Sequence, residues 1–312
     1  MSSPAATTWS RLLGVADAGV RIDKLLTQYA PECSRAVARR LCSLGRVRLD
    51  GRRVGKGELG SAGALLRLDG LPAEAGLAAL PDASVALHVR HVDPWLLVVD
   101  KPAGIPSHPL LSGELGTLAS GLVAAYPELA TLGYSPREPG LVHRLDTGTS
   151  GLLLVARTTA AFEGLRALLR AGGLDKRYLA LCVGQVPARL VLTGWLRARG
   201  PRVRVSQRAA AGGRPIELNV LRSEPRGPFS LVEVRVLHAG RHQIRAQLAA
   251  AGFPLVGDAL YGGPDCAELS RHFLHASTLA LEHPWTGQRL QVHSPLPHEL
   301  EGFLNKTAAD AT

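Results

Sequence analysis

The residues best suited to chemistry lie together in the segment His143 to Gly151. Asp146 stands two residues after Arg144 and just before a turn of small residues, and the apolar run 152–156 that follows is typical of a buried strand. A carboxylate on a tight loop held by a sheet can act as a nucleophile or as a general base. The alternative is an aspartate that only hydrogen-bonds its own turn.

The elements that would position this loop alternate between strands and helices. The sequence predicts a buried strand at 95–99, helices at 117–126 and 158–171, a half-exposed strand at 232–236 and a helix at 241–251. The chain has 312 residues, of which 46% are hydrophobic, enough for one large domain and a small one.

The segment 143–153 resembles the signature of the RluA-type RNA pseudouridine synthases, in which His-Arg-Leu-Asp precedes two variable residues and Thr-Ser-Gly-Leu. Further segments of this chain resemble the same family, in the same order. They are Val98–Gly104, Lys176–Ala180, His242–Arg245 with 257–262, Leu274–Ala276 and Ser294–Pro297.

The resemblance implies an α+β fold, with a mixed and mostly antiparallel central sheet flanked by helices. It implies an isomerase that converts specific uridines of structured RNA, ribosomal or transfer RNA, to pseudouridine. Because substrate and product are isomers, the reaction needs no redox cofactor and no ATP, and we expect no metal. The target base must leave its stack to be reached.

The family motifs also imply roles for four residues. Asp146 would attack the sugar or the ring, or would remove a sugar proton, and the sequence leaves these roles open. Arg245 would be the cation beside this carboxylate, since a nearby positive charge favours the ionised form. Tyr178 would lie under the flipped base, where it could also handle a ring proton. Arg144 would fill the vacancy that the base leaves and hold phosphate.

Two segments depart from the family pattern. His238-Ala239-Gly240-Arg241 stands where the family has Thr-Gly-Arg-Thr, so that the arginine has moved by one position. Arg214-Pro215-Ile216-Glu217 replaces residues that are usually small or threonine. The role of Arg241 is therefore open.

The formal net charge of +10 is concentrated near the N-terminus, where residues 21–68 hold eleven basic and four acidic side chains. A helix at 35–44 and a hairpin turning at Asp50-Gly51 would present this charge. The segment resembles the S4-type RNA-binding domain, whereas a merely solvated charged face is the alternative. The residues expected to bind RNA are Arg21, Lys24, Arg35, Arg39, Arg46 and Arg48.

These observations predict an N-terminal tail (1–19), an S4-like domain (20–69), a linker (70–86), a catalytic domain (87–305) and a C-terminal tail (306–312). Four scattered cysteines and the absence of a secretion signal or a long apolar run indicate a soluble cytoplasmic protein. We expect a monomer that binds RNA and no membrane.

Other chemistries fit less well. The segment 55–60 matches G-x-G-x-x-G, but the residues after it do not look helical, which argues against a nucleotide cofactor. A hydrolase centred on Ser150 lacks the full nucleophile motif, and the histidines lack metal-ligand spacing, so that His242 and His275 are expected to orient loops. A non-catalytic RNA-binding or ribosome assembly factor with this fold stays open as a rival.

Overall fold

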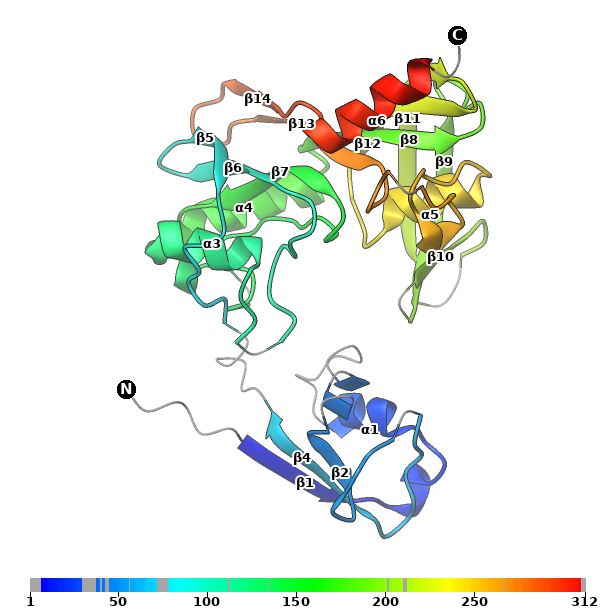
Figure 1. Cartoon of the computed structure of the whole chain (residues 1–312). Coiled ribbons are helices and arrows are strands. Elements are labelled where there is room, and N and C mark those ends of the chain that lie inside the picture. Colours follow the sequence, from blue (N-terminus) through cyan, green and yellow to red (C-terminus); the bar gives the residue numbers. More distant parts are fainter. Residues whose placement is uncertain are drawn as a thin grey trace.

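The computed structural model describes most of the chain (Figure 1). The described residues are 7–29, 38–39, 41–42, 45–55, 57–71, 78–111, 113–133, 135–200, 202–209, 212–266 and 268–309.

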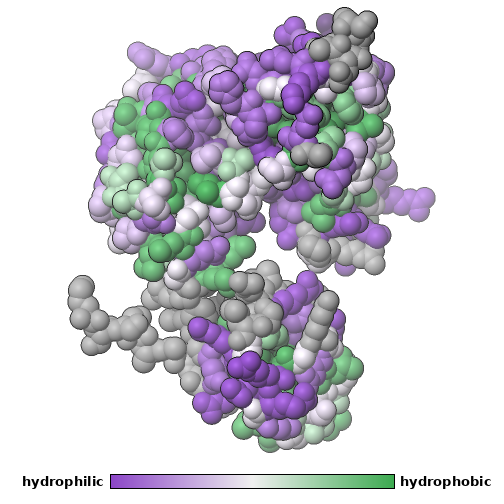
Figure 2. Space-filling view, viewed as in Figure 1, coloured by the Kyte–Doolittle hydropathy of each residue, from purple (hydrophilic) through white to green (hydrophobic). Residues whose placement is uncertain are grey.

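The N-terminal unit is built on a four-stranded sheet with the order β1-β4-β2-β3. Its strands are β1 (Thr7–Leu12), β2 (Val47–Leu49), β3 (Arg52–Arg53) and β4 (Leu65–Leu71). The helix α1 (Ile22–Tyr29) and a short 3-10 helix, η1 (Val15–Asp17), belong to the same unit. Apolar side chains from α1, β2 and β4 form its core, among them Leu25, Val47 and Leu66. Hydrophilic residues cover much of its visible face (Figure 2).

The prediction that residues 1–19 form a tail is wrong for the described part of that range. β1 pairs antiparallel with β4, and Leu13 is buried in the core of the small unit. β1 is an edge strand that carries polar residues and an exposed Leu12, so its sequence lacks the apolar alternation of a half-buried strand.

The helix expected at 35–44 lies largely outside the described residues. Where the structure describes it, at 38–39 and 41–42, the chain is helical. Ala38 and Leu41 are buried there and Arg39 is exposed, which agrees with one apolar and one basic face.

A ten-stranded sheet forms the body of the large unit, with the order β10-β9-β11-β12-β8-β13-β7-β6-β5 and with β14 beside β13. The pairs are antiparallel except for β13 with β7, which confirms the mixed, mostly antiparallel α+β fold. The strands are β5 (His88–Val92), β6 (Leu96–Lys101), β7 (Ser150–Ala156), β8 (Asp175–Val183), β9 (Val191–Arg199), β10 (Arg202–Ser206), β11 (Arg214–Arg226), β12 (Phe229–Val236), β13 (Leu274–Glu282) and β14 (Arg289–His293).

Helices pack around this sheet, and the expected helical segments are present. They are α3 (Leu118–Ala125), α4 (Thr159–Arg170), α5 (Gln243–Ala250) and α6 (His298–Ala309), with 3-10 turns η3 (Pro127–Thr131) and η4 (Ala259–Tyr261). Thr117 and Thr158 cap α3 and α4, because each side chain accepts a hydrogen bond from a backbone N–H three residues on.

Two further boundary predictions need correction. β4 runs to Leu71, and Ala79 is buried against the large core, so part of the expected linker 70–86 belongs to the two units. α6 continues to Ala309, so that the described part of the expected tail 306–312 is helical, and Leu300 and Phe303 anchor this helix in a core. In the described part of the chain, no helix is long and apolar enough to cross a membrane.

Candidate active site

The loop that carries Asp146 precedes β7 and is fixed by neighbouring segments. The Ser107 hydroxyl accepts from the Leu145 N–H (3.1 Å) and donates to the Leu145 carbonyl (2.8 Å). The Gly104 N–H donates to the carbonyl of Thr147 (2.9 Å), and the Thr149 N–H donates to that of Asp146 (3.0 Å). These bonds hold the backbone on both sides of the carboxylate, so that its direction is set before any substrate arrives.

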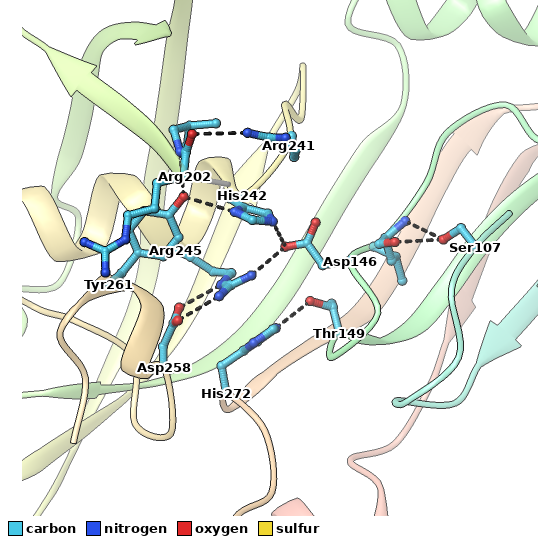
Figure 3. A network of polar contacts seen from close by, with 12 residues as sticks. Ser107, Asp146, Thr149, Arg202, Arg241, His242, Arg245, Asp258, Tyr261 and His272 are labelled. Atoms are coloured by element: carbon cyan, nitrogen blue, oxygen red, sulfur yellow. Dashed lines mark hydrogen bonds and ion pairs between the residues drawn. The ribbon is translucent and has the colours of Figure 1, made fainter. Parts of the chain in front are cut away.

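The carboxylate of Asp146 points toward the start of α5 (Figure 3). Its Oδ2 lies 3.1 Å from Arg245 Nη1 and 3.9 Å from His242 Nε2. The Asp146 side chain keeps 22% of its surface exposed, whereas Arg245 keeps 9%. The structure thus brings together the two residues expected at the chemical centre and leaves the carboxylate reachable.

Asp258 holds Arg245 from the other side (Figure 3). Its two oxygens accept from Arg245 Nε and Nη2, both at 2.7 Å. Burial by itself lowers the pKa of Arg245, but Asp258 and Asp146 outweigh it and raise the pKa. Asp258 lies in the family-like block 257–262, which is the sequence signal for it, although no site role was predicted for this residue.

Tyr178 lies on β8 with 3% of its surface exposed. Burial, and then the charge of Asp146, raise the pKa of its hydroxyl, so that it keeps its proton near neutral pH. Tyr178 and Asp146 line one cavity of about 40 Å³, together with Ile244 and Leu274. The aromatic ring and the carboxylate therefore face the same small cavity, with apolar side chains beside them.

Arg144 is the exposed member of the expected set. Its side chain is 55% exposed, and its Nη1 lies 3.0 Å from His108 Nε2 and 3.7 Å from Glu138 Oε1. It makes no contact with the Arg245–Asp258 pair within the described residues and is available to an approaching polyanion.

Arg241, the arginine that the motif shift moved, contacts a neighbouring hairpin. Its Nη2 donates to the carbonyl of Gly200 (2.8 Å), which follows β9. The same nitrogen donates to the carbonyl of Arg202 (3.1 Å), the first residue of β10 (Figure 3). His242 has a left-handed backbone (φ 54°), and its Nδ1 lies 3.0 Å from the Tyr261 hydroxyl. Arg241 thus binds the backbone of the β9–β10 hairpin, and Tyr261 holds His242 in place beside Asp146.

The geometry argues against the rival chemistries. Ser150 is 1% exposed, and its hydroxyl contacts His275 Nδ1 (2.9 Å) and Arg271 Nη2 (3.0 Å). A substrate therefore cannot reach this hydroxyl, as a hydrolase centred on Ser150 would require. Among the described residues, no cluster of three or more His, Cys, Asp or Glu could hold a metal ion. The segment 55–60 is followed by β4 rather than by a helix, as expected.

The basic residues of the N-terminal unit fall into two groups. Arg21 and Arg39 pair with Asp23, and Arg48 pairs with Asp69. Lys24 and Arg46 are exposed and have no carboxylate partner within the described ranges. Arg35 lies outside the described residues.

Exposed basic side chains clustered on one small unit are typical of proteins that bind nucleic acid. The RNA pseudouridylate synthase family model matches residues 95–250, and the S4 domain model matches residues 20–58. The chain belongs to the RNA pseudouridylate synthase family, and it is an RNA pseudouridine synthase with an N-terminal S4 domain.

Relatives match nearly the whole chain. An uncharacterized RNA pseudouridine synthase of Chloroflexus aurantiacus is 38% identical over 294 residues, covering 92% of this chain and 89% of that protein. Ribosomal large subunit pseudouridine synthase D of Pseudomonas aeruginosa is 32% identical over 306 residues, covering 94% and 93%. The structure of human RNA pseudouridylate synthase domain containing 1 is similar to 70% of this chain and 86% of that chain, at 26% identity and a TM-score of 0.53.

Proposed function

We propose that this enzyme isomerises one or more uridines of ribosomal RNA in the cytoplasm, with Asp146 as the essential group. The observation that carries the proposal is the chain of ion pairs Asp146–Arg245–Asp258, in which Asp146 and Arg245 line the same cavity as Tyr178. The choice of ribosomal RNA over transfer RNA rests on the relatives named as large-subunit enzymes.

The reaction breaks the bond from N1 of uracil to C1′ of ribose and forms a bond from C5 to C1′. The proton on C5 is lost and N1 gains one, so that atoms and electrons balance without a co-reactant. Asp146 either attacks the sugar or the ring or removes a sugar proton, and Arg245 stabilises its carboxylate in each case. We assign the Tyr178 ring to the face of the flipped base and Arg144 to the vacated stack and its phosphates.

The test is Asp146→Asn, which keeps the shape of the side chain and removes its charge. We expect no pseudouridine in an unmodified large-subunit ribosomal RNA transcript, with RNA affinity within a few-fold of wild type. The matched control is Asp265→Asn, a change at an exposed carboxylate outside the site that should leave turnover unaltered. Turnover by Asp146→Asn at even a few per cent of the wild-type rate would remove Asp146 as the essential group.

The same assay tests the expectation that no cofactor is needed. Enzyme treated with EDTA and desalted should keep its activity on an RNA that folds without divalent ions. If wild-type enzyme modifies only transfer RNA, the assignment of the substrate is wrong while that of Asp146 stands. If it modifies no RNA but binds ribosomal RNA tightly, the assembly-factor hypothesis is favoured.

A further inference from the structure

A second, larger cavity of about 470 Å³ adjoins the Asp146 loop, and its wall is strongly basic. Asp146 lines both this cavity and the small one that contains Tyr178, so the two are neighbours. We call it the basic cavity. Its cationic side chains are Arg144, Arg166, Arg170, Lys176, Arg214 and Arg241.

Among the described residues, only two carboxylates line the cavity beside these six cations, and both have partners already. Asp146 contacts Arg245 at 3.1 Å, and Glu138 lies 3.2 Å from His108 and 3.7 Å from Arg144. The wall therefore carries an excess of positive charge in a partly desolvated space, where an anion is bound more strongly than on an open surface.

Lys176 is the most unusual member of this wall. It is 3% exposed and lies on the same face of β8 as Tyr178, two residues away. Its ammonium has no hydrogen-bond acceptor or carboxylate partner within the described part of the chain. Burial, and then the charge of Arg214, lower the pKa of Lys176 to about 8. The side chain is enclosed, but its ammonium is reached from the cavity that it lines, so this lysine is better explained by a ligand than by a role in the fold.

Arg214 of β11 is the second cation placed for a ligand. Its Nη2 donates only to neutral oxygens, the carbonyl of His238 and Oε1 of Gln243, both at 3.3 Å. A Cβ at position 240 would clash with this nitrogen, so that the arginine can take this place only over a glycine. The two segments that depart from the family pattern, 214–217 and 238–241, are therefore coupled. Gly240 leaves room for the Arg214 side chain, while Arg241 binds the hairpin between β9 and β10.

We propose that the basic cavity binds a phosphodiester group of the RNA strand next to the flipped uridine, with Lys176 and Arg214 as its ligands. This inference rests on the proposed function. A nucleobase would be a poorer occupant, since no described Phe, Tyr or Trp lines this cavity and its polar groups are mostly donors. A phosphate oxygen accepts from an ammonium and a guanidinium at once.

The test compares Lys176→Met and Arg214→Gln with Arg222→Gln, each made in an Asp146→Asn background so that binding is measured without turnover. Arg222 lies on β11 with Arg214, is 74% exposed and pairs with Glu224, so it is a matched control for lost charge. On a large-subunit ribosomal RNA transcript we expect Kd to rise about 10-fold or more for each cavity variant. The log–log salt slope should fall by roughly 0.7 for each lost phosphate contact. Arg222→Gln should change neither quantity.

The pH dependence of binding is a second readout. Because only the protonated ammonium attracts an anion, wild-type affinity should decrease as the pH rises through about 8, the pKa of Lys176 in the free protein. Two histidines, His143 and His238, also line the cavity. Burial, and then the charge of Lys176, hold the pKa of His143 well below its ordinary value, so that it stays neutral across this range. Lys176→Arg should bind RNA without the decrease near pH 8.

Thermal stability separates binding from a structural role. Lys176→Met should keep or raise the Tm, since it removes a buried charge. If Lys176→Met lowers the Tm and leaves the RNA affinity unchanged, the inference is wrong and the role of Lys176 is structural. Inorganic phosphate should compete with RNA for the cavity of the wild-type protein. If it weakens RNA binding equally in the wild type and in the cavity variants, phosphate acts elsewhere, and this result would also count against the inference.

Failure of this inference can be told from failure of the proposed function. If wild-type enzyme forms pseudouridine but both cavity variants bind RNA normally, this inference fails alone. If wild-type enzyme forms none in any RNA, the proposed function fails.

Discussion

Asp146 contacts one guanidinium, and Asp258 fixes that guanidinium by two hydrogen bonds on its far side. Asp258 is almost fully buried, and Arg245 is 9% exposed. The orientation of Arg245 toward Asp146 therefore depends on a residue that does not itself line the substrate cavity. Asp258 is a positioning residue.

We predict that Asp258→Asn lowers both stability and turnover, in contrast to Asp146→Asn. Removing one partner of a buried ion pair leaves the other charge uncompensated, which costs about 3–5 kcal/mol of the free energy of unfolding. Urea unfolding measures this loss, and single-turnover kinetics should show a lower rate constant. Asp146→Asn keeps the Arg245–Asp258 pair and should cost far less. Equal stability of the two variants would contradict this ranking.

The sequence could supply Asp146, Arg245 and Tyr178 because each lies in a compact motif, and the structure places these side chains around one cavity. Their catalytic roles remain predictions. Asp258 was harder to assign, since its partner lies thirteen residues away and the approach of the two segments depends on how the loop after α5 folds back. Arg214 was visible only as a departure, because its contact with the 238–243 segment joins a strand and a loop distant in sequence.

At the scale of elements, the position of the catalytic loop depends on β7, which is buried along its whole length. The apolar run 152–156 predicted this strand because burial on both faces needs apolar side chains throughout. The sequence did not predict that β7 pairs in parallel with β13, through His275 opposite Ser150 and Ala276 opposite Gly151. Such pairing joins segments more than a hundred residues apart and leaves no local pattern.

Gly151 makes that pairing possible. Its φ is +112°, and a Cβ there would clash with the backbone of Ala276. We predict that Gly151→Ala destabilises the protein by several kcal/mol, because backbone must shift and the conformation is strained for an L side chain. The control is Gly287→Ala, which has φ +67° but no atom within 4 Å of its Cβ and should cost about 1 kcal/mol. Urea unfolding of both variants measures the difference, and similar losses would show that strain rather than the close approach decides the cost.

At the scale of the whole molecule, the chain divides into two sheets with separate cores. The clustered charge and the motif resemblance indicated the small unit correctly as an S4 domain, and the family model agrees over residues 20–58. The boundaries were less predictable, since β1 and the residues around Ala79 are recruited by packing against partners that a local pattern does not reveal. The structure also separates the basic residues of the small unit that pair with a carboxylate from those that do not, a distinction that the sequence could not give.

That division gives a prediction for RNA binding by the N-terminal unit. Lys24 and Arg46, which have no carboxylate partner in the described part of the chain, are the better candidates for phosphate contacts. The double variant Lys24→Ala/Arg46→Ala should flatten the log–log salt dependence of ribosomal RNA binding by roughly 1–2 units. The control, Arg52→Ala/Arg67→Ala, removes the same charge from residues paired with Glu58 and Asp69 and should flatten the slope less. Equal slopes for the two double variants would mean that net charge alone, rather than contact with phosphate, governs binding by this unit.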